Sequence, residues 1–279
     1  FGLTRTLHEL KNAALDIANG KYGRQVAVHS KDELGELALA FNQMSRQLEN
    51  AIQARRQMTA DIAHDLRSPL TVIQGYTEAL SDGKLEGGEE VYQILHQETQ
   101  HLSRLVDDLR LLSLADAGEI PLALQAVDPK VLLERAHARF RMQAEQKQVD
   151  FSLEAPETLP AICVDTERMT QVLDNLIQNA LRHTPAGGTI KLRAAQEQNQ
   201  VILQVSDNGS GIPPQDLPRI FDRFYRVDPS RSHNGESGLG LAIVKSLVEA
   251  QAGSIHVESA LGKGTTFTIT FPIAKGKPS

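Results

Sequence analysis

One stretch of the chain, residues 58–70, combines residue types that suit nucleophilic chemistry. A helix turns about 100° per residue, so His64 lies about 200° from Ile62 and Leu66, which continue an apolar stripe, and its imidazole should face solvent. Pro69 should bend this helix. An exposed imidazole beside a carboxylate can act as a nucleophile, although most surface histidines only titrate near neutral pH. The candidate catalytic residues lie within about one helical turn: His64, Asp65, Arg67 and Ser68.

A second polar group follows one face of a predicted helix over residues 166–183. Asn175, Asn179 and His183 recur at a spacing of four residues, and Arg182 lies beside them. Asparagine is a poor helix former, whereas its amide oxygen suits Mg²⁺ that carries nucleotide phosphates. Arg182 would add positive charge. The alternative is an ordinary solvated helix face.

Asp207 ends a predicted strand and is followed by Gly209, Gly211 and Ile212. Its carboxylate can accept a hydrogen bond from the exocyclic amine of adenine but would repel the carbonyl of guanine, which favours ATP over GTP. The glycines allow the backbone to approach a planar ligand closely. The same residues would also suit a simple tight turn.

A polar segment after residue 225 has the composition of a lid over a phosphate site. Before it stand aromatic anchors, and after it two glycines open a helix whose free N-terminal amides could bind anionic oxygens. Arg231 could meet phosphates within the lid. The candidate nucleotide contacts in this region are Phe221, Phe224, Arg231, Gly238, Leu239, Gly240 and Leu241.

Composition limits the class of protein that carries these residues. The chain has 279 residues, 41% hydrophobic and 23% charged, which is typical of soluble globular domains. A net charge of -6 argues against nucleic acid as a partner, and the single Cys163 excludes a disulfide framework. There is no apolar run near 18 residues, so no membrane span is expected. Because the sequence begins at Phe1, we expect a soluble fragment of a longer protein.

Two apolar heptad stripes precede residue 50 and call for a coiled-coil partner. Asn19-Gly20 should end the first helix, and Ser30-x-x-Glu33 is a capping box for the second. The segments Asp32–Gly35 and Phe41–Met44 resemble the HAMP relay module, which implies a HAMP domain at residues 1–50 and a membrane anchor and sensor upstream. A generic dimerising coiled coil is the alternative. The stripes consist of Leu3, Leu7, Leu10, Ala14 and Ile17, then Leu34, Leu37, Phe41, Met44 and Leu48.

Residues 51–117 predict a helical hairpin. Apolar periodicity runs without a break to Leu80, a polar turn follows, and a second helix carries apolar residues from Val91 to Leu112. Two helices cannot enclose a core, so we expect a homodimeric four-helix bundle with His64 on its outside. A linker is expected near residues 117–126.

Residues 127–275 predict an α/β two-layer sandwich. Asp128 and Pro129 begin a helix, further helices are expected near 166–183 and 238–251, and alternating strands near 149–153, 189–193, 201–205, 254–257 and 266–271. Several strand connections are too short for helical crossovers. We therefore expect a mixed sheet covered by helices on one face.

Other nucleotide folds fit poorly, since the chain has no G-x-x-x-x-G-K-[ST] loop and Ile243 stands at the third position of a dinucleotide fingerprint. The ordered motifs resemble the N, G1, F and G2 boxes and the terminal Gly-Thr motif of the Bergerat-type ATPase fold, which implies that ATP is bound. Thr266 belongs to that last motif. The motifs are Asn175/Asn179, Asp207-x-Gly-x-Gly211, Phe221/Phe224, Gly238-x-Gly240 and Gly262-x-Gly-Thr-Thr-Phe267.

The segment His64-Asp-Leu-Arg-Ser-Pro-Leu70 resembles the H box of HisKA-type bacterial sensor histidine kinases, and with the other motifs this resemblance covers nearly the whole chain. It implies ATP-dependent autophosphorylation of His64, oriented or deprotonated by Asp65, and transfer to an aspartate of a response-regulator receiver domain. It further implies Mg²⁺ at Asn175 and Asn179 and adenine at Asp207. The parent protein would lie in the cell membrane with this part in the cytoplasm.

Two alternatives share the same nucleotide fold. One is a pseudokinase scaffold that binds ATP only to set its conformation, and the other is a chaperone-like ATPase, which has no use for the H box. Ser68 also departs from the Thr or Asn usual in family members that dephosphorylate their regulator. Its hydroxyl could still position a water, so phosphatase activity stays an open question at this point.

Overall fold

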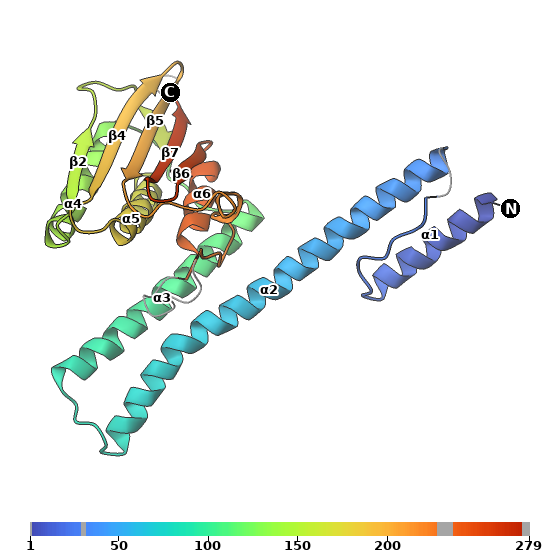
Figure 1. Ribbon diagram of the computed structural model, residues 1–279, viewed down its shortest axis with the longest axis horizontal. Helices are drawn as coiled ribbons and strands as arrows, with labels where there is room; N and C mark the ends of the chain where they lie inside the picture. The colour runs from blue at the N-terminus through green and yellow to red at the C-terminus, as the bar shows by residue number, and fades with distance from the viewer. Residues whose placement is uncertain (1, 29–31, 228–236, 275–279) are drawn as a thin grey trace. The chain divides into compact units, whose positions relative to one another are not determined.

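The computed structural model describes residues 2–28, 32–227 and 237–274 (Figure 1). The chain forms two compact units, Phe1–Ser68 and Pro69–Ser279, which we describe in turn. Among the described residues, no helix combines the length and the apolar character that crossing a lipid bilayer requires.

The first unit contains helix α1 (Gly2–Ala18) and the greater part of helix α2 (Glu33–Ser81). Gly20, with φ of +84°, follows the end of α1, as predicted. The predicted cap Ser30 lies outside the described residues; Asp32 caps α2 by accepting from the amides of Leu34 and Gly35. A small core joins α1, the connector and α2: Leu10, Ala13 and Val26 are buried, and Phe41 packs against them.

The extended connector is fastened to α2 by buried polar side chains. The Asn42 amide accepts from Val26 N–H at 2.7 Å and donates to Val26 C=O at 2.8 Å. Ser45 Oγ donates to the carbonyl of Arg24 at 2.8 Å. Two residues of the predicted stripe on α2 nevertheless stay half exposed, Leu37 at 49% and Met44 at 52%. This is the pattern expected of a surface that packs on another chain.

Helix α2 continues through Pro69, so the single long helix predicted through the His64 segment is confirmed. A proline has no N–H to donate to the carbonyl four residues earlier, which here belongs to Asp65.

In the second unit, helix α3 (Glu89–Ala117) follows a turn and ends at Gly118 in the left-handed conformation. Its last turns pack on the α/β part: Leu111 and Leu112 are buried in the core of that part. Arg223 also forms a bidentate ion pair with Asp116, in which the hydrogen bond from Nη1 to Oδ2 measures 2.7 Å. The linker predicted near residues 117–126 spans residues 118–124, because α3 ends at Ala117 and strand β1 (Gln125–Val127) begins within the predicted range.

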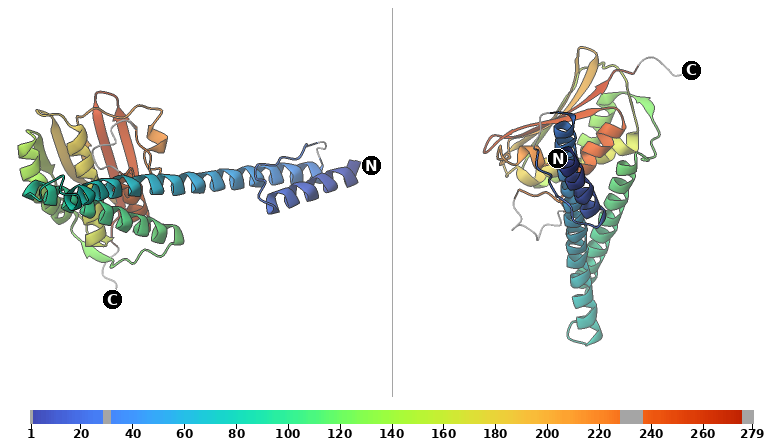
Figure 2. Two further views of the ribbon diagram at one scale, coloured as in Figure 1. Left: turned by 90° about the horizontal axis from the view of Figure 1, so that it is seen from below. Right: turned by 90° about the vertical axis from the view of Figure 1, so that its right-hand side faces the viewer.

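The α/β part has one five-stranded sheet with the order β2-β4-β5-β7-β6 and a separate β1-β3 pair. Strand β2 runs parallel to β4 and the other neighbours are antiparallel, which confirms the predicted mixed sheet. Figures 1 and 2 show α4, α5 and α6 on one face of it. The remaining elements are α4 (Pro129–Gln146), β2 (Asp150–Glu154), β3 (Ile162–Val164), α5 (Thr166–His183), β4 (Thr189–Glu197), β5 (Gln200–Asp207), a 3-10 turn (Leu217–Arg219), α6 (Gly240–Ala250), β6 (Ser254–Ala260) and β7 (Gly264–Pro272).

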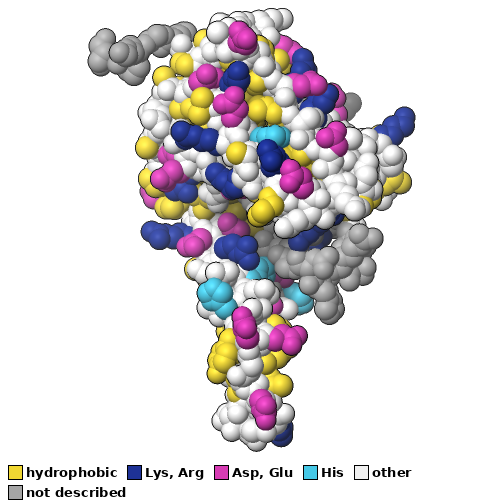
Figure 3. All heavy atoms as spheres, turned by 90° about the vertical axis from the view of Figure 1, so that its left-hand side faces the viewer, with side chains coloured by type: hydrophobic (Ala, Val, Ile, Leu, Met, Phe, Trp, Pro, Cys, Tyr) yellow, Lys and Arg dark blue, Asp and Glu magenta, His cyan; other side chains and the backbone are white. Residues whose placement is uncertain are grey.

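Alternation along the strands builds the core between sheet and helices. On β7, Phe267, Ile269 and Phe271 are buried while the residues between them are only half buried. Asp128 accepts from the amide of Lys130, which confirms the predicted start of α4, and Asp165 caps α5 by accepting from two of its amides. On the face drawn in Figure 3, basic and acidic side chains are interspersed, with no large patch of one sign.

Candidate functional site

His64 lies on α2 with its side chain 79% exposed, which confirms the exposure predicted from the helical stripe. Its Nδ1 lies 3.1 Å from Oδ1 of Asp65. If the neutral ring donates Nδ1–H to this carboxylate, the lone pair resides on Nε2, which is the nitrogen away from the hydrogen bond. The pair thus provides an oriented nucleophile. Arg67 and Ser68 are exposed on the same helix, whereas Pro69 is buried.

Helix α5 positions the predicted asparagines on one flank of its buried face. Asn175 and Asn179 are half buried one turn apart. The side-chain amide of Asn175 donates to the carbonyl of Gly240 at 3.4 Å, so α5 meets the start of α6 at this point. Arg182 and His183 are exposed at the C-terminal end of α5.

Asp207 lies at the end of β5, where its Oδ1 accepts from Gly209 N–H at 2.8 Å. Burial raises the pKa of Asp207, although the amides of Gly209 and Thr265 and the charge of His183 oppose that shift. A half-buried carboxylate held by backbone amides is a rigid acceptor. The effect of its charge on this pKa places His183 near Asp207.

The glycines after Asp207 are required by contacts within the protein. A Cβ on Gly209 would lie 2.4 Å from the His183 carbonyl oxygen, and one on Gly211 would lie 2.0 Å from that of Ala260. The close approach predicted toward a ligand is therefore made to the chain's own backbone. Ile212 packs at the edge of the core, and its amide donates to Ser259 Oγ.

The aromatic anchors pack against the same core. Phe221 meets Phe267 edge-on, with ring centroids 6.4 Å apart. Phe224, at φ of +61°, donates its N–H to the carbonyl of Gly238 at 3.0 Å. The described ends of the predicted lid are therefore joined, while Arg231 within it lies outside the described residues.

The second glycine of the Gly238-x-Gly240 turn lies beside Asn175 of α5, at a distance that a side chain would tolerate. The nearest atom to a Cβ built on Gly240 is 3.8 Å away and belongs to Asn175. Leu239 is fully buried and Leu241 is half buried. The first backbone amides of α6 have no partner within the helix and can bind anionic oxygens.

Thr266 does not join this cluster. The register pairs Asp207 with Thr265, and Ser206 with Thr266. Residues directly opposite each other share one face of a sheet, so Thr266 lies on the face opposite to Asp207, and its hydroxyl donates to Ser206 at 3.0 Å. From the Gly262–Phe267 motif the sequence analysis selected Thr266, whereas its neighbour Thr265 is the one that lies opposite Asp207. Ser259, which contacts Thr265, was marked by no sequence motif.

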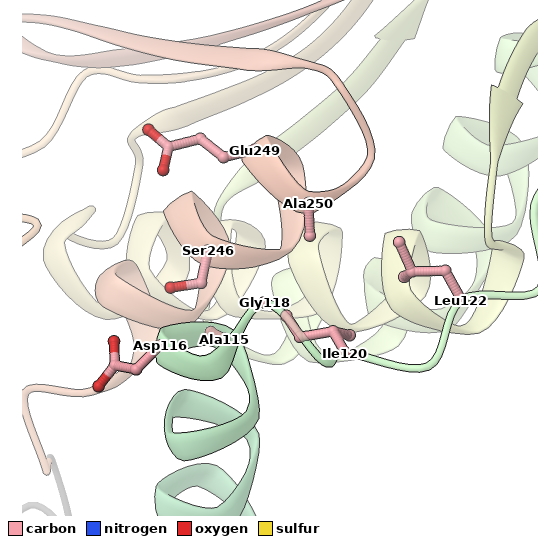
Figure 4. Close-up of a pocket in the computed structure, with 8 residues that line it drawn as sticks. All are labelled: Ala115, Asp116, Gly118, Ile120, Leu122, Ser246, Glu249 and Ala250. Atoms are coloured by element: carbon pink, nitrogen blue, oxygen red, sulfur yellow. The ribbon is translucent and has the colours of Figure 1, made fainter.

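A pocket of about 380 Å³ lies elsewhere, between the end of α3, the linker and the C-terminal half of α6 (Figure 4). None of the predicted site residues lines it. Its walls are Ala115, Asp116, Gly118, Ile120, Leu122, Ser246, Glu249 and Ala250.

The donor set fits Mg²⁺ that is carried by phosphates better than a metal held by the protein alone. Among the described residues, no group of three or more His, Cys, Asp or Glu side chains could hold a metal ion. Mg²⁺ in nucleotide sites takes one or two protein oxygens and completes its shell with phosphates and water. The amide oxygen of Asn175, beside the turn at Gly240, and that of Asn179, one helical turn further along α5, meet that requirement.

Three protein families match consecutive parts of the chain. Residues 2–50 match the HAMP domain, residues 54–118 the His Kinase A (phospho-acceptor) domain, and residues 164–275 the Histidine kinase-, DNA gyrase B-, and HSP90-like ATPase. The signal transduction histidine-protein kinase BaeS of Escherichia coli is 36% identical over 275 residues, 98% of this chain and 59% of BaeS. The sensor histidine kinase WalK of Bacillus subtilis is 38% identical over 226 residues, 79% of this chain and 37% of WalK. The chain thus spans less than two thirds of these relatives.

Solved structures agree with the sequence relatives. The histidine kinase AdeS of Acinetobacter baumannii is similar with a TM-score of 0.64 and 30% identity over 76% of this chain and 98% of that one. ShkA in complex with AMPPNP has a TM-score of 0.60 and 29% identity, over 80% of this chain and 47% of that one. ThkA in complex with the response regulator protein TrrA has a TM-score of 0.64 and 25% identity, over 85% and 67%. With these matches along nearly its whole length, the chain belongs to the HisKA-type bacterial sensor histidine kinases.

Proposed function

We propose that this protein phosphorylates itself on His64 with ATP and passes the phosphoryl group to an aspartate of a response-regulator receiver domain. The observation that carries the proposal is the exposed His64 imidazole, hydrogen-bonded through Nδ1 to Asp65, in a chain that also holds the asparagine, aspartate and glycine set of the ATPase fold. The proposed domains are HAMP at 1–50, dimerisation and phosphotransfer at 51–117, and catalysis at 127–275.

In the first reaction, the Nε2 lone pair of neutral His64 attacks the γ-phosphorus of ATP, the bond from that phosphorus to the β,γ-bridging oxygen breaks, and ADP leaves. Asp65 holds the Nδ1 proton and stabilises the positive charge that develops on the ring. In the second, a receiver carboxylate oxygen attacks the same phosphorus and the N–P bond breaks. His64 then regains its neutral form.

On the nucleotide side, we assign Asp207 to the exocyclic amine of adenine, with Ile212 beside the base. Asn175 and Asn179 would hold Mg²⁺, which neutralises charge on the transferring group. The amides from Gly238 to Leu241 would bind phosphate oxygens at the start of α6, with Arg182 adding positive charge nearby. The aromatic pair Phe221 and Phe224 would anchor the lid.

The proposed assembly is a homodimer that meets a receiver domain. The His Kinase A match and the half-exposed stripe on α2 support the dimer, and the ThkA structure with TrrA supports the receiver as partner. We also propose that the whole protein is anchored in the cell membrane with these domains in the cytoplasm, on the strength of the HAMP match. The proposal is limited to the forward reactions, because Ser68 is neither the Thr nor the Asn of the phosphatase-active pattern.

The test is incubation of the full chain with Mg-ATP labelled at the γ-phosphate. We expect a label that is stable in alkali and lost in acid, as a phosphoramidate should be, and that disappears in His64→Gln. Asn179→Ala should lose the label as well but keep the dimer, since it alters the nucleotide side alone.

The matched control is His96→Gln, which removes an exposed histidine of α3 that contacts Gln100. This variant should be labelled like the unmodified chain. Label that survives acid, or that persists in His64→Gln, would contradict the kinase mechanism. ATP binding without any label would favour the pseudokinase.

A further inference from the structure

Ser259 lies where two loops of the proposed nucleotide pocket meet. It is a half-buried residue of β6, and its strand partner across the ladder is Thr265 of β7. Its Oγ accepts from the amide of Ile212 at 2.8 Å and donates to the carbonyl of Gly264 at 2.8 Å. The hydroxyl of Thr265 lies 2.9 Å away.

These three contacts use the full capacity of a hydroxyl group. A serine side chain has one proton to donate and two lone pairs to accept. With Gly264 as acceptor and Ile212 as donor, the remaining lone pair is matched by the Thr265 hydroxyl. A residue of similar size that lacks a hydroxyl could not satisfy all three partners.

The same contacts tie together both sides of the Asp207 carboxylate. Thr265 lies opposite Asp207 in the ladder and gives it a backbone N–H, while Ile212 closes the loop that begins after Asp207. The loops are also joined by a hydrogen bond from Gly262 N–H to Ser210 C=O at 2.7 Å. Next to it, a Cβ on Gly211 would lie 2.0 Å from the carbonyl oxygen of Ala260, so the two loops are in close contact.

We propose that Ser259 is a positioning residue that sets base selectivity: it holds Ile212 and Thr265 so that Asp207 points at the exocyclic amine of adenine. The inference rests on the proposed function, because it presumes that a nucleotide occupies this pocket. Ser259 itself need not touch the ligand. Its loss should therefore affect the discrimination between bases more than the binding of phosphates.

The experiment compares ADP with IDP, which carries a carbonyl in place of the amine, by calorimetric titration of the full chain in the presence of Mg²⁺. The unmodified chain should prefer ADP. In Ser259→Ala, the Kd for ADP should rise about tenfold while that for IDP changes less than about twofold, so that the preference falls about tenfold. Ser259→Thr keeps the hydroxyl and should restore the preference.

Ser254→Ala is the matched control, since it removes a hydroxyl from the same strand that contacts Thr270 on the exposed face. This variant should keep the preference for ADP. Should Ser259→Ala fail to fold, Ser259→Cys, which has a similar volume and a weak hydrogen-bonding group, should show the same fall. Hydrogen exchange of the Ile212 amide provides an independent readout and should accelerate in either variant.

The outcomes separate the two proposals. If the unmodified chain binds neither nucleotide, the proposed function fails. If it prefers ADP but the Ser259 variants keep that preference, or lose affinity for both nucleotides equally, the inference about Ser259 is overturned. An equal loss of preference in Ser254→Ala overturns it as well.

Discussion

Single carboxyl groups differ sharply in their surroundings within this chain. Burial raises the pKa of Asp207, Asp174 and Asp108, whereas the ion pair with Arg223 lowers that of Asp116. Asp207, whose carboxyl has a raised pKa, belongs to the proposed adenine pocket. Asp108 lies on α3, outside that pocket, and has no role in the proposed reaction. Its raised pKa therefore matters for stability alone.

The pKa of Asp108 rises from 3.8 to about 6 because of burial, with a smaller contribution from the charge of Asp107. A folded-state pKa above the ordinary value means that the folded chain binds the proton more tightly. The free energy of unfolding should therefore fall as pH rises from 3.8 to about 6. Asp108→Asn should remove this fall and raise stability at neutral pH by about 1 kcal/mol, after discounting for solvent screening.

Urea unfolding across this pH range measures the effect. Asp107→Asn is the companion variant, since it removes only the neighbouring charge, and its gain should be smaller. A pH profile that stays unchanged in Asp108→Asn would show that this carboxyl is not the source.

At the level of elements, Asp165 joins three parts of the second unit. Its carboxylate caps α5 through the amides of Glu167 and Arg168 and also accepts from Ala123 N–H in the linker at 2.8 Å. Its own N–H donates to the buried side chain of Gln251, next to the end of α6. Asp165 therefore links α5, which carries Asn175, to α6, which begins at Gly240.

Asp165→Ala should destabilise the α/β part by about 2–3 kcal/mol, because it removes the helix cap and leaves the Ala123 amide unpaired. Burial alone would raise the pKa of Asp165, but its hydrogen bonds and the charge of Arg168 outweigh burial and lower it. This stabilisation should therefore be present above the ordinary pKa of 3.8 and be lost as pH falls through the lower folded-state value.

The control for this variant is Asp128→Ala, which removes the exposed cap of α4 with its single hydrogen bond to Lys130. It should cost about 1 kcal/mol. Both are measured by urea unfolding followed by circular dichroism at neutral pH. Equal losses in the two variants would argue against a joining role for Asp165.

At the scale of the whole molecule, the chain leaves apolar surface that a single copy does not cover. Leu37 and Met44 belong to the predicted stripe, and in Figure 3 hydrophobic side chains also gather on the stem made by the end of α2 and the start of α3. Surface of this kind fits the proposed homodimer.

The double change Leu37→Gln and Met44→Gln should raise the Kd of the dimer at least a hundredfold. It changes two side chains in each protomer, four in the dimer, and each should contribute about 1 kcal/mol less to the association free energy. Sedimentation equilibrium gives the value. Leu39→Gln is the control, because Leu39 is 55% exposed on the same helix but lies outside the stripe. A similar loss in Leu39→Gln would mean that the stripe is not the interface.

By itself, the sequence determined the elements whose signals are local. Helix α5 begins at Thr166 and ends at His183, as predicted, because Asp165 caps a strongly amphipathic segment. The order of the motifs and the exposure of His64 were likewise readable, since helical spacing fixes which face a side chain takes. The three-residue strands β1 and β3 were missed, because so short a run carries no clear alternation.

Only the tertiary structure decided what depends on pairing distant segments. Thr265 and Thr266 are neighbours in sequence, yet the register places only Thr265 on the face of Asp207. A strand has a side-chain period of two, so one residue of register exchanges the two faces. Ser259 forms hydrogen bonds to Ile212, which lies 47 residues earlier in the sequence, and to Gly264, which lies 5 residues later. No local pattern encodes this pair of contacts.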